Sequence, residues 1–75
     1  MKYEDLLLPS PPSRGEIEKC IKNSTWQDLR VSLKGEPTSV KLAKLRAYLK
    51  KDSSRCAKVV VHNYINALKR GGQLR

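Results

Sequence analysis

The sequence predicts an all-α protein, a small bundle of four short helices. Three observations predict this class. Apolar residues recur at helical spacing in four segments, residues with capping side chains precede these segments, and the breaks between them contain Gly, Pro, Ser and Asp. We expect helices at about residues 14–23, 25–34, 39–51 and 54–70. A chain of 75 residues accommodates one domain at most.

Residues 1–12 are predicted to form an extended arm before a single helical domain at residues 13–75. Prolines at positions 9, 11 and 12 prevent a regular helix in this arm. A small domain has little apolar surface, so the arm's leucines could cover the protein's own core. The alternative is that the arm docks on a partner protein. The candidate partner-docking residues are Tyr3, Leu6, Leu7 and Leu8.

Each of the first two helices begins with a possible capping box. In this motif a Ser hydroxyl accepts a hydrogen bond from a backbone N–H of the first turn, and the Glu or Gln side chain three residues later accepts one from the backbone N–H of the Ser. Ser13 and Glu16 would form the first box, and Ser24 and Gln27 the second. Gly35 is expected to end the second helix. The apolar faces are expected to contain Ile17, Cys20 and Ile21 in the first helix and Trp26, Leu29 and Leu33 in the second.

The last two helices are joined by a short break at residues 52–54, a pattern typical of a helix-turn-helix-like pair. Thr38 or Ser39 is expected to cap the third helix. Consecutive valines at residues 59–61 leave a strand as an alternative, but the helical periodicity continues to Leu68. The expected apolar residues are Leu42, Leu45 and Leu49 in the third helix, and Ala57, Val60, Val61, Tyr64, Ala67 and Leu68 in the fourth, with Ile65 at its edge.

The charge of the chain is strongly asymmetric. Sixteen Lys and Arg against seven Asp and Glu give a formal net charge of +9. Residues 1–37 contain six basic and six acidic residues, whereas residues 38–75 contain ten basic residues and a single acid, Asp52. This pattern predicts an anionic partner for the second half, and nucleic acid, expected to be DNA, is the commonest one for a small basic domain. The alternative is that the charge serves solubility alone.

The candidate nucleic-acid interface is the face of the fourth helix opposite its apolar side, with lysines of the third helix. Asn can pair with adenine, Arg with guanine, and the Val59 methyl groups can meet thymine, while Lys and Arg hold phosphates. The fourth helix would read bases and the third would cross the backbone. The predicted interface residues are Lys44, Lys51, Arg55, Lys58, His62, Asn63, Asn66, Lys69 and Arg70.

Cys20 and Cys56 lie at apolar positions of predicted helices, so we expect two reduced thiols that behave as small buried hydrophobic groups. No metal site or cofactor is predicted, because the cysteines form no ligand cluster with the single His. The short apolar run near the N-terminus is neither a signal peptide nor a membrane span. We therefore expect a cytoplasmic protein with no membrane partner.

An enzyme is not expected, because the sequence lacks a Ser, His and Asp set, a Cys and His pair, and a Gly-rich phosphate loop. Gly71-Gly72-Gln73 matches the tripeptide by which peptide release factors act on peptidyl-tRNA, and that resemblance covers three residues. Here the glycines follow a predicted helix, so a helix stop is the favoured interpretation.

Residues 26–49, WQDLRVSLKGEPTSVKLAKLRAYL, and residues 63–74, NYINALKRGGQL, resemble small uncharacterised proteins of tailed phages that infect cyanobacteria. The resemblance covers about half of the chain. It implies a phage protein that acts in the host cytoplasm, in transcription control, in DNA metabolism or packaging, or on a host enzyme. The NYINAL segment also resembles a helix in the core-binding domain of tyrosine recombinases, which implies DNA binding without catalysis.

Two alternatives to nucleic-acid binding stay open. The chain could be a phage-type adaptor that binds and modulates a host or phage protein through the N-terminal arm and the basic surface. It could also be a small virion component or a self-associating bundle, since small domains often dimerise to enlarge their core. The expected partners are thus nucleic acid first, then a host or phage protein, then a second copy of the chain.

Overall fold

In the computed structural model, which describes residues 3–74, the chain folds into four α-helices and one short 3₁₀ helix. Residues 3–74 contain no strand, so the predicted all-α bundle of four short helices is confirmed and the three consecutive valines are helical. The elements are η1 (Glu4–Leu6), α1 (Arg14–Cys20), α2 (Ser24–Leu33), α3 (Thr38–Lys51) and α4 (Arg55–Arg70).

Serine side chains cap α1 and α4, and the cap of α1 is the one predicted from the sequence. The hydroxyl of Ser13 accepts a hydrogen bond from the backbone N–H of Glu16 at 3.2 Å. At the start of α4, the Ser54 hydroxyl accepts from the N–H of Ala57 at 3.3 Å. Each bond satisfies a donor that would otherwise have no partner in the first helical turn. The Glu16 carboxylate pairs with Arg55 of α4, so it links two helices where a capping box was predicted.

Two predicted caps are wrong. Asn23, and not Ser24, caps α2, because the Asn23 side chain accepts from two N–H groups of the first turn at 2.8 and 3.3 Å. As a result α1 ends before this cap, a few residues earlier than predicted. At α3 the cap position is occupied by Pro37, which has no capping side chain, so Thr38 and Ser39 lie inside the helix.

Two glycines adopt positive φ where helices end. Gly35 has φ of +80° just after α2 and Gly72 has φ of +77° just after α4, a conformation that other residues adopt at a cost. After α4 the N–H of Gln73 donates to the carbonyl of Leu68 at 3.0 Å, as in a Schellman motif. The Gly71–Gln73 tripeptide thus forms the stop of α4.

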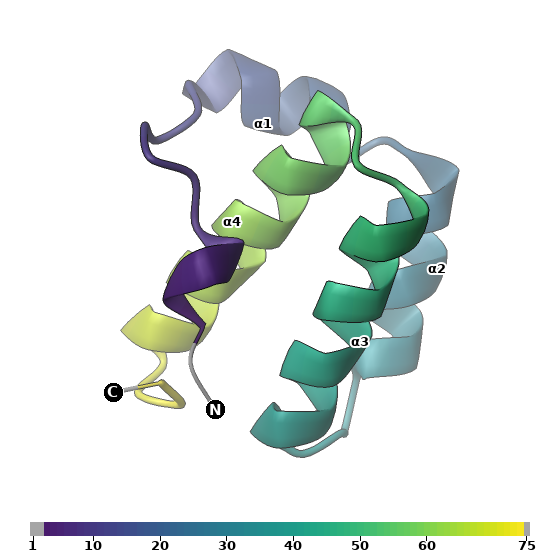
Figure 1. Cartoon of the computed structure of the whole chain (residues 1–75), viewed down its shortest axis with the longest axis vertical. Helices are drawn as coiled ribbons and strands as arrows, with labels where there is room; N and C mark the ends of the chain where they lie inside the picture. Colours follow the sequence, from purple (N-terminus) through teal and green to yellow (C-terminus); the bar gives the residue numbers. More distant parts are fainter. Residues whose placement is uncertain (1–2, 75) are drawn as a thin grey trace.

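The core is organised around α4, which packs against α1, α3 and η1. Figure 1 shows α4 between the N-terminal arm and α3, with α1 across its first turns. Ile65, expected at the edge of the apolar face, is fully buried, while Ala67, expected inside it, is exposed. The buried residues of α4 are Ala57, Val59, Val60, Val61, His62, Ile65 and Leu68.

An aromatic cluster joins α2, α3 and α4. Trp26 of α2 is 2% exposed. Its ring centroid lies 6.0 Å from that of Tyr48 on α3 and 5.8 Å from that of Tyr64 on α4, the latter in an edge-to-face arrangement. Aromatic side chains bury more apolar area than any others, so this contact fixes how the three helices sit together.

The N-terminal arm lies against the domain. Leu6 is buried in the core, and Tyr3, Leu7 and Leu8 pack against it partly buried. The arm contains η1 and is irregular between residues 7 and 13, so it is not extended throughout. The four candidate partner-docking residues therefore cover the protein's own core. This is the first of the two alternatives that the sequence left open for the arm. The first two residues of the predicted arm lie outside the described residues.

A disulfide bond joins Cys20 at the end of α1 to Cys56 in the first turn of α4. The prediction of two reduced thiols is therefore wrong. The two residues are 36 positions apart in the sequence, and α1 brings them together because it packs on the start of α4. No helix within residues 3–74 has the length and apolar character needed to cross a lipid bilayer.

Candidate nucleic-acid interface

The predicted base-reading face of α4 contains two buried residues. Val59 is 0% exposed and His62 is 6% exposed, so the prediction that both face outward is wrong. The physical reason is that α1 and η1 pack on α4 in addition to α3. A helix that reads a DNA groove needs an open face, and the two buried residues interrupt that face in the first half of α4.

His62 serves the fold. Its Nδ1 accepts a hydrogen bond from the backbone N–H of Leu8 at 2.9 Å. Burial, and to a smaller degree the positive charge of Lys69, lower the pKa of the His62 imidazole below 6.5. The neutral ring that accepts at Nδ1 holds its proton on Nε2. His62 is therefore a tether for the arm and is removed from the candidate interface.

The other predicted residues of α4 contact different neighbours. Arg55 forms two hydrogen bonds, of 3.0 and 3.2 Å, with the carboxylate of Glu16, and these bonds lower the pKa of that carboxyl group. The Lys69 ammonium lies 5.7 Å from the ring centroid of Tyr3. Asn63 and Asn66 are half-buried, whereas the remaining two residues, Lys58 and Arg70, are exposed.

Helix α3 is the most basic element of the fold. It contains five Lys and Arg and no acidic residue. Arg46 forms an ion pair with Asp5 of the arm, and the Lys44 ammonium donates to the backbone carbonyl of Ser32 at 3.0 Å. The basic residues of α3 are Lys41, Lys44, Arg46, Lys50 and Lys51. They lie on both flanks of the helix, one toward α2 and the other toward the arm.

The flank of α3 toward α2 contains both predicted phosphate contacts of this helix. Lys44 and Lys51 line a groove of about 330 Å³ between the two helices. Tyr48 also lines it, and its buried hydroxyl has no hydrogen-bond partner among residues 3–74. Burial and the nearby charge of Asp52 raise the pKa of Tyr48, so the phenol is neutral. The groove is positively charged through its lysines.

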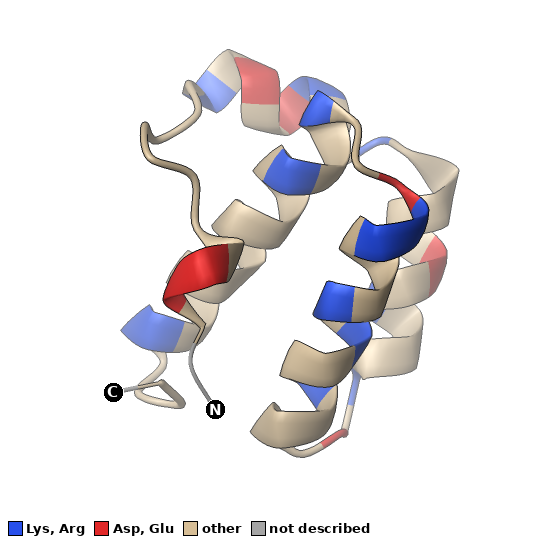
Figure 2. Ribbon diagram, viewed as in Figure 1, with Lys and Arg blue, Asp and Glu red and all other residues tan. Residues whose placement is uncertain are grey.

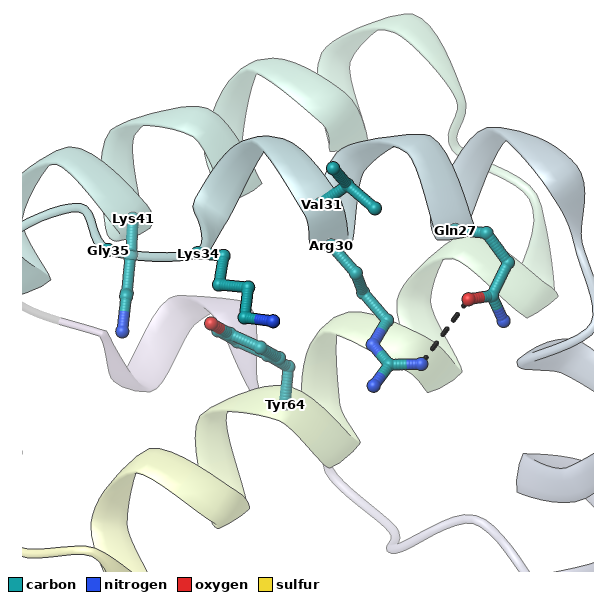
Figure 3. A pocket seen from close by; sticks show the side chains of 7 residues that line it. All are labelled: Gln27, Arg30, Val31, Lys34, Gly35, Lys41 and Tyr64. Carbon is teal, nitrogen blue, oxygen red and sulfur yellow. Dashed lines mark hydrogen bonds between the residues drawn. The ribbon is translucent and has the colours of Figure 1, made fainter.

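A second basic site was not predicted. Arg30 and Lys34 of the α2 segment, Lys41 of α3 and Tyr64 of α4 line a pocket of about 420 Å³. In Figure 3 the Tyr64 hydroxyl points toward the side chains of Lys34 and Lys41, while Arg30 extends along the same wall. The signal available in the sequence was the spacing of Arg30 and Lys34, four residues apart at the end of a helix. It was hidden because residues 1–37 are neutral in sum.

The nine predicted interface residues thus do not gather in one place. Lys44 and Lys51 line the α2–α3 groove, Arg55 pairs with Glu16 of α1, and His62 and Lys69 contact the arm. Figure 2 shows Lys and Arg along the visible side of α3 and at both ends of α4, with acidic residues of α1 and η1 on the elements that pack against α4. Among residues 3–74 no cluster of His, Cys, Asp or Glu could hold a metal ion.

Comparison of the chain with protein-family models, with curated proteins and with solved structures gave no match.

Proposed function

We propose that this chain is a small basic nucleic-acid-binding protein that holds phosphate groups with the basic residues of α3. The observation that carries the proposal is the composition of α3, five Lys and Arg without an acidic residue. Lys44 and Lys51 line a concave surface beside α2, where a phosphate chain can be contacted from two helices. Neutralising phosphates releases condensed counterions, which favours binding.

The proposal assigns α3, and not α4, to the nucleic acid. The buried positions of Val59 and His62 leave α4 without a continuous face for base edges, whereas α3 presents flexible lysines suited to phosphates. In this form α3 and α4 are a helix-turn-helix-like pair in which α3 keeps its contact with the backbone and α4 does not read bases. We therefore expect binding with weak sequence preference, to DNA in the first instance, and no catalysis.

The resemblance of residues 26–49 and 63–74 to phage proteins extends the proposal to a phage protein that acts in the host cytoplasm. The Cys20–Cys56 bond restricts this extension, because reducing compartments keep thiols unpaired. In a reducing compartment the form of the protein with Cys20 and Cys56 as free thiols is the one that would bind nucleic acid. Binding should therefore be measured with and without a reductant.

The experiment is a salt series of duplex DNA binding, followed by fluorescence anisotropy of a labelled duplex. We expect log Kobs to fall with log salt at a slope of about −0.9 for each phosphate neutralised. The variant Lys44→Gln/Lys51→Gln should lower the magnitude of the slope by about 1 for each phosphate that it no longer neutralises. Lys19→Gln/Lys22→Gln on the α1 side removes the same charge from exposed positions and should have a smaller effect.

Equal losses in the two variants would show that net charge and not α3 governs binding. No binding to duplex DNA or to RNA at low salt would overturn the proposal. Binding to an acidic protein in place of nucleic acid would then favour the adaptor alternative. In that case the basic surface would be the contact, since Leu6 of the arm is buried in the domain.

A further inference from the structure

The pocket between α2, α3 and α4 is a collection of positive charges without a counter-charge. Arg30, Lys34 and Lys41 line it, and none of its lining residues is acidic. Two of these cations donate hydrogen bonds to neutral groups: Arg30 donates to the Gln27 amide oxygen at 3.3 Å, and Lys41 donates to the Gln73 amide oxygen at 3.5 Å. Like charges that share a concave site repel one another, and a bound anion removes that repulsion.

The cationic donors come from two segments, α2 with the residue that follows it and α3, and all of them line the same pocket. Arg30 belongs to α2, Lys34 follows its last turn, and Lys41 lies in the first turns of α3. The backbone between them is held by the tight turn at Gly35, where the N–H of Glu36 donates to the Leu33 carbonyl at 3.2 Å. This turn sets the backbone position of Lys34 relative to α3.

Tyr64 adds a neutral donor on the opposite wall. Its ring packs edge-to-face on Trp26 with centroids 5.8 Å apart, so its direction is set by the core. Its hydroxyl points toward Lys34 and Lys41 (Figure 3). A planar guanidinium, two ammonium groups and a hydroxyl on opposite walls match a ligand with several anionic oxygens at different angles, as in a phosphoryl group.

We propose that this pocket is a phosphate-binding site for the phosphoryl groups of a nucleic-acid backbone or of a free polyphosphate. Its volume of about 420 Å³ lies within the range of roughly 300–1,000 Å³ typical of ligand sites. The inference deepens the proposed function where the phosphate belongs to nucleic acid. Where the phosphate belongs to a free polyphosphate, the inference is independent of the proposed function, because the pocket and the α2–α3 groove have different lining residues.

The test titrates the 75-residue chain with inorganic pyrophosphate, and separately with a short single-stranded oligonucleotide, by calorimetry and by amide chemical shifts. The pocket variant is Arg30→Gln/Lys34→Gln. The charge-matched control is Lys19→Gln/Lys22→Gln, which removes two exposed cations that line neither the pocket nor the α2–α3 groove. We expect the pocket variant to weaken pyrophosphate binding about tenfold or more, because it removes charge-assisted hydrogen bonds, and the control to weaken it less than about twofold.

A second variant, Tyr64→Phe, keeps the ring on Trp26 and removes the hydroxyl donor. It should weaken pyrophosphate binding several-fold without changing the thermal midpoint by more than a few degrees, which separates loss of the site from loss of the fold. Citrate is the control ligand, because it has three carboxylates and no phosphoryl group. Citrate binding as tight as that of pyrophosphate would overturn the phosphate assignment.

The outcomes also separate the two sources of phosphate. Pyrophosphate binding that is abolished in the pocket variant, with no oligonucleotide binding, supports the pocket and contradicts the proposed function. Oligonucleotide binding that the pocket variant weakens more than the control supports a backbone phosphate in the pocket. Equal effects of the two charge variants on both probes, or binding of neither probe, would overturn the site.

Discussion

The backbone N–H of Leu8 donates a hydrogen bond to Nδ1 of His62 across 54 positions of sequence, at 2.9 Å. The bond ties the N-terminal arm to the central helix. An imidazole accepts at Nδ1 only while that nitrogen is unprotonated. Attachment of the arm is therefore linked to the protonation of His62, the single His of the chain.

The first prediction concerns stability below neutral pH. Burial lowers the pKa of folded His62 below 6.5, while the unfolded chain takes up its proton near 6.5. Between the two values the unfolded state binds more protons, so the stability present above pH 6.5 is lost as pH falls toward the folded pKa. Urea unfolding at steps between pH 8 and 5 should show the unfolding free energy decreasing over this window and then levelling.

His62→Asn is the control for that decrease, because its side-chain oxygen can accept from Leu8 and does not titrate. In this variant the pH dependence between pH 8 and 5 should disappear. The carboxyl groups with lowered pKa, Asp5, Glu16 and Asp52, contribute stability above their unfolded values and lose it at lower pH. An unchanged slope in His62→Asn would show that other groups are responsible.

The second prediction concerns the disulfide. Closing a loop between residues 36 positions apart restricts the unfolded chain and is worth about 4 kcal/mol in the loop-entropy model. Reduction should lower the unfolding free energy by about this amount, measured by urea unfolding with and without reductant. Cys20→Ala/Cys56→Ala should be insensitive to reductant and as unstable as the reduced protein. No response of the unmodified chain to reductant would contradict the bond.

The helices were predictable because their signals are local. Ser13 caps the helix that it was expected to cap, and apolar spacing placed Trp26 and Leu45 in the core. The bounds of α1 and α2 were shifted because Ser24 and Asn23 are both good caps, and the choice between neighbours depends on the packing of the whole helix.

The candidate site was harder to predict, because it depends on which elements pack together. Val59 and His62 lie outside the apolar stripe of α4, and nothing in the periodicity indicates that the arm and α1 cover this side. The Cys20–Cys56 bond depends on the same packing. Arg30 and Lys34 were hidden because adding charges over residues 1–37 assumes that acids nearby in sequence are nearby in space.

The third prediction tests whether Val59 of α4 is buried in the core or faces solvent, as a base-reading residue would. Val59→Asn places an amide where the side chain is 0% exposed, and burying an unpaired amide together with the loss of apolar packing should cost about 3 kcal/mol or more. Asn66→Ala, at a half-buried position on the same helix, should change stability by less than about 1 kcal/mol. Equal and small effects in thermal unfolding would show that Val59 faces solvent, as the sequence alone suggested.

The fourth prediction compares the two glycines that end α4. Gly72 has φ of +77°, where an L side chain costs about 1–2 kcal/mol, so Gly72→Ala should lower the thermal midpoint. Gly71 has φ of −80°, and an added Cβ would lie 3.5 Å from the Ala67 carbonyl oxygen, an ordinary contact. Gly71→Ala should therefore be neutral or stabilising by about 0.4–1 kcal/mol, because Ala restricts the unfolded chain.

The two variants remove the same residue type from adjacent positions, so the difference between their thermal midpoints measures the cost of the left-handed conformation at Gly72. Equal midpoints would contradict the Schellman stop that holds Gln73 against the end of α4.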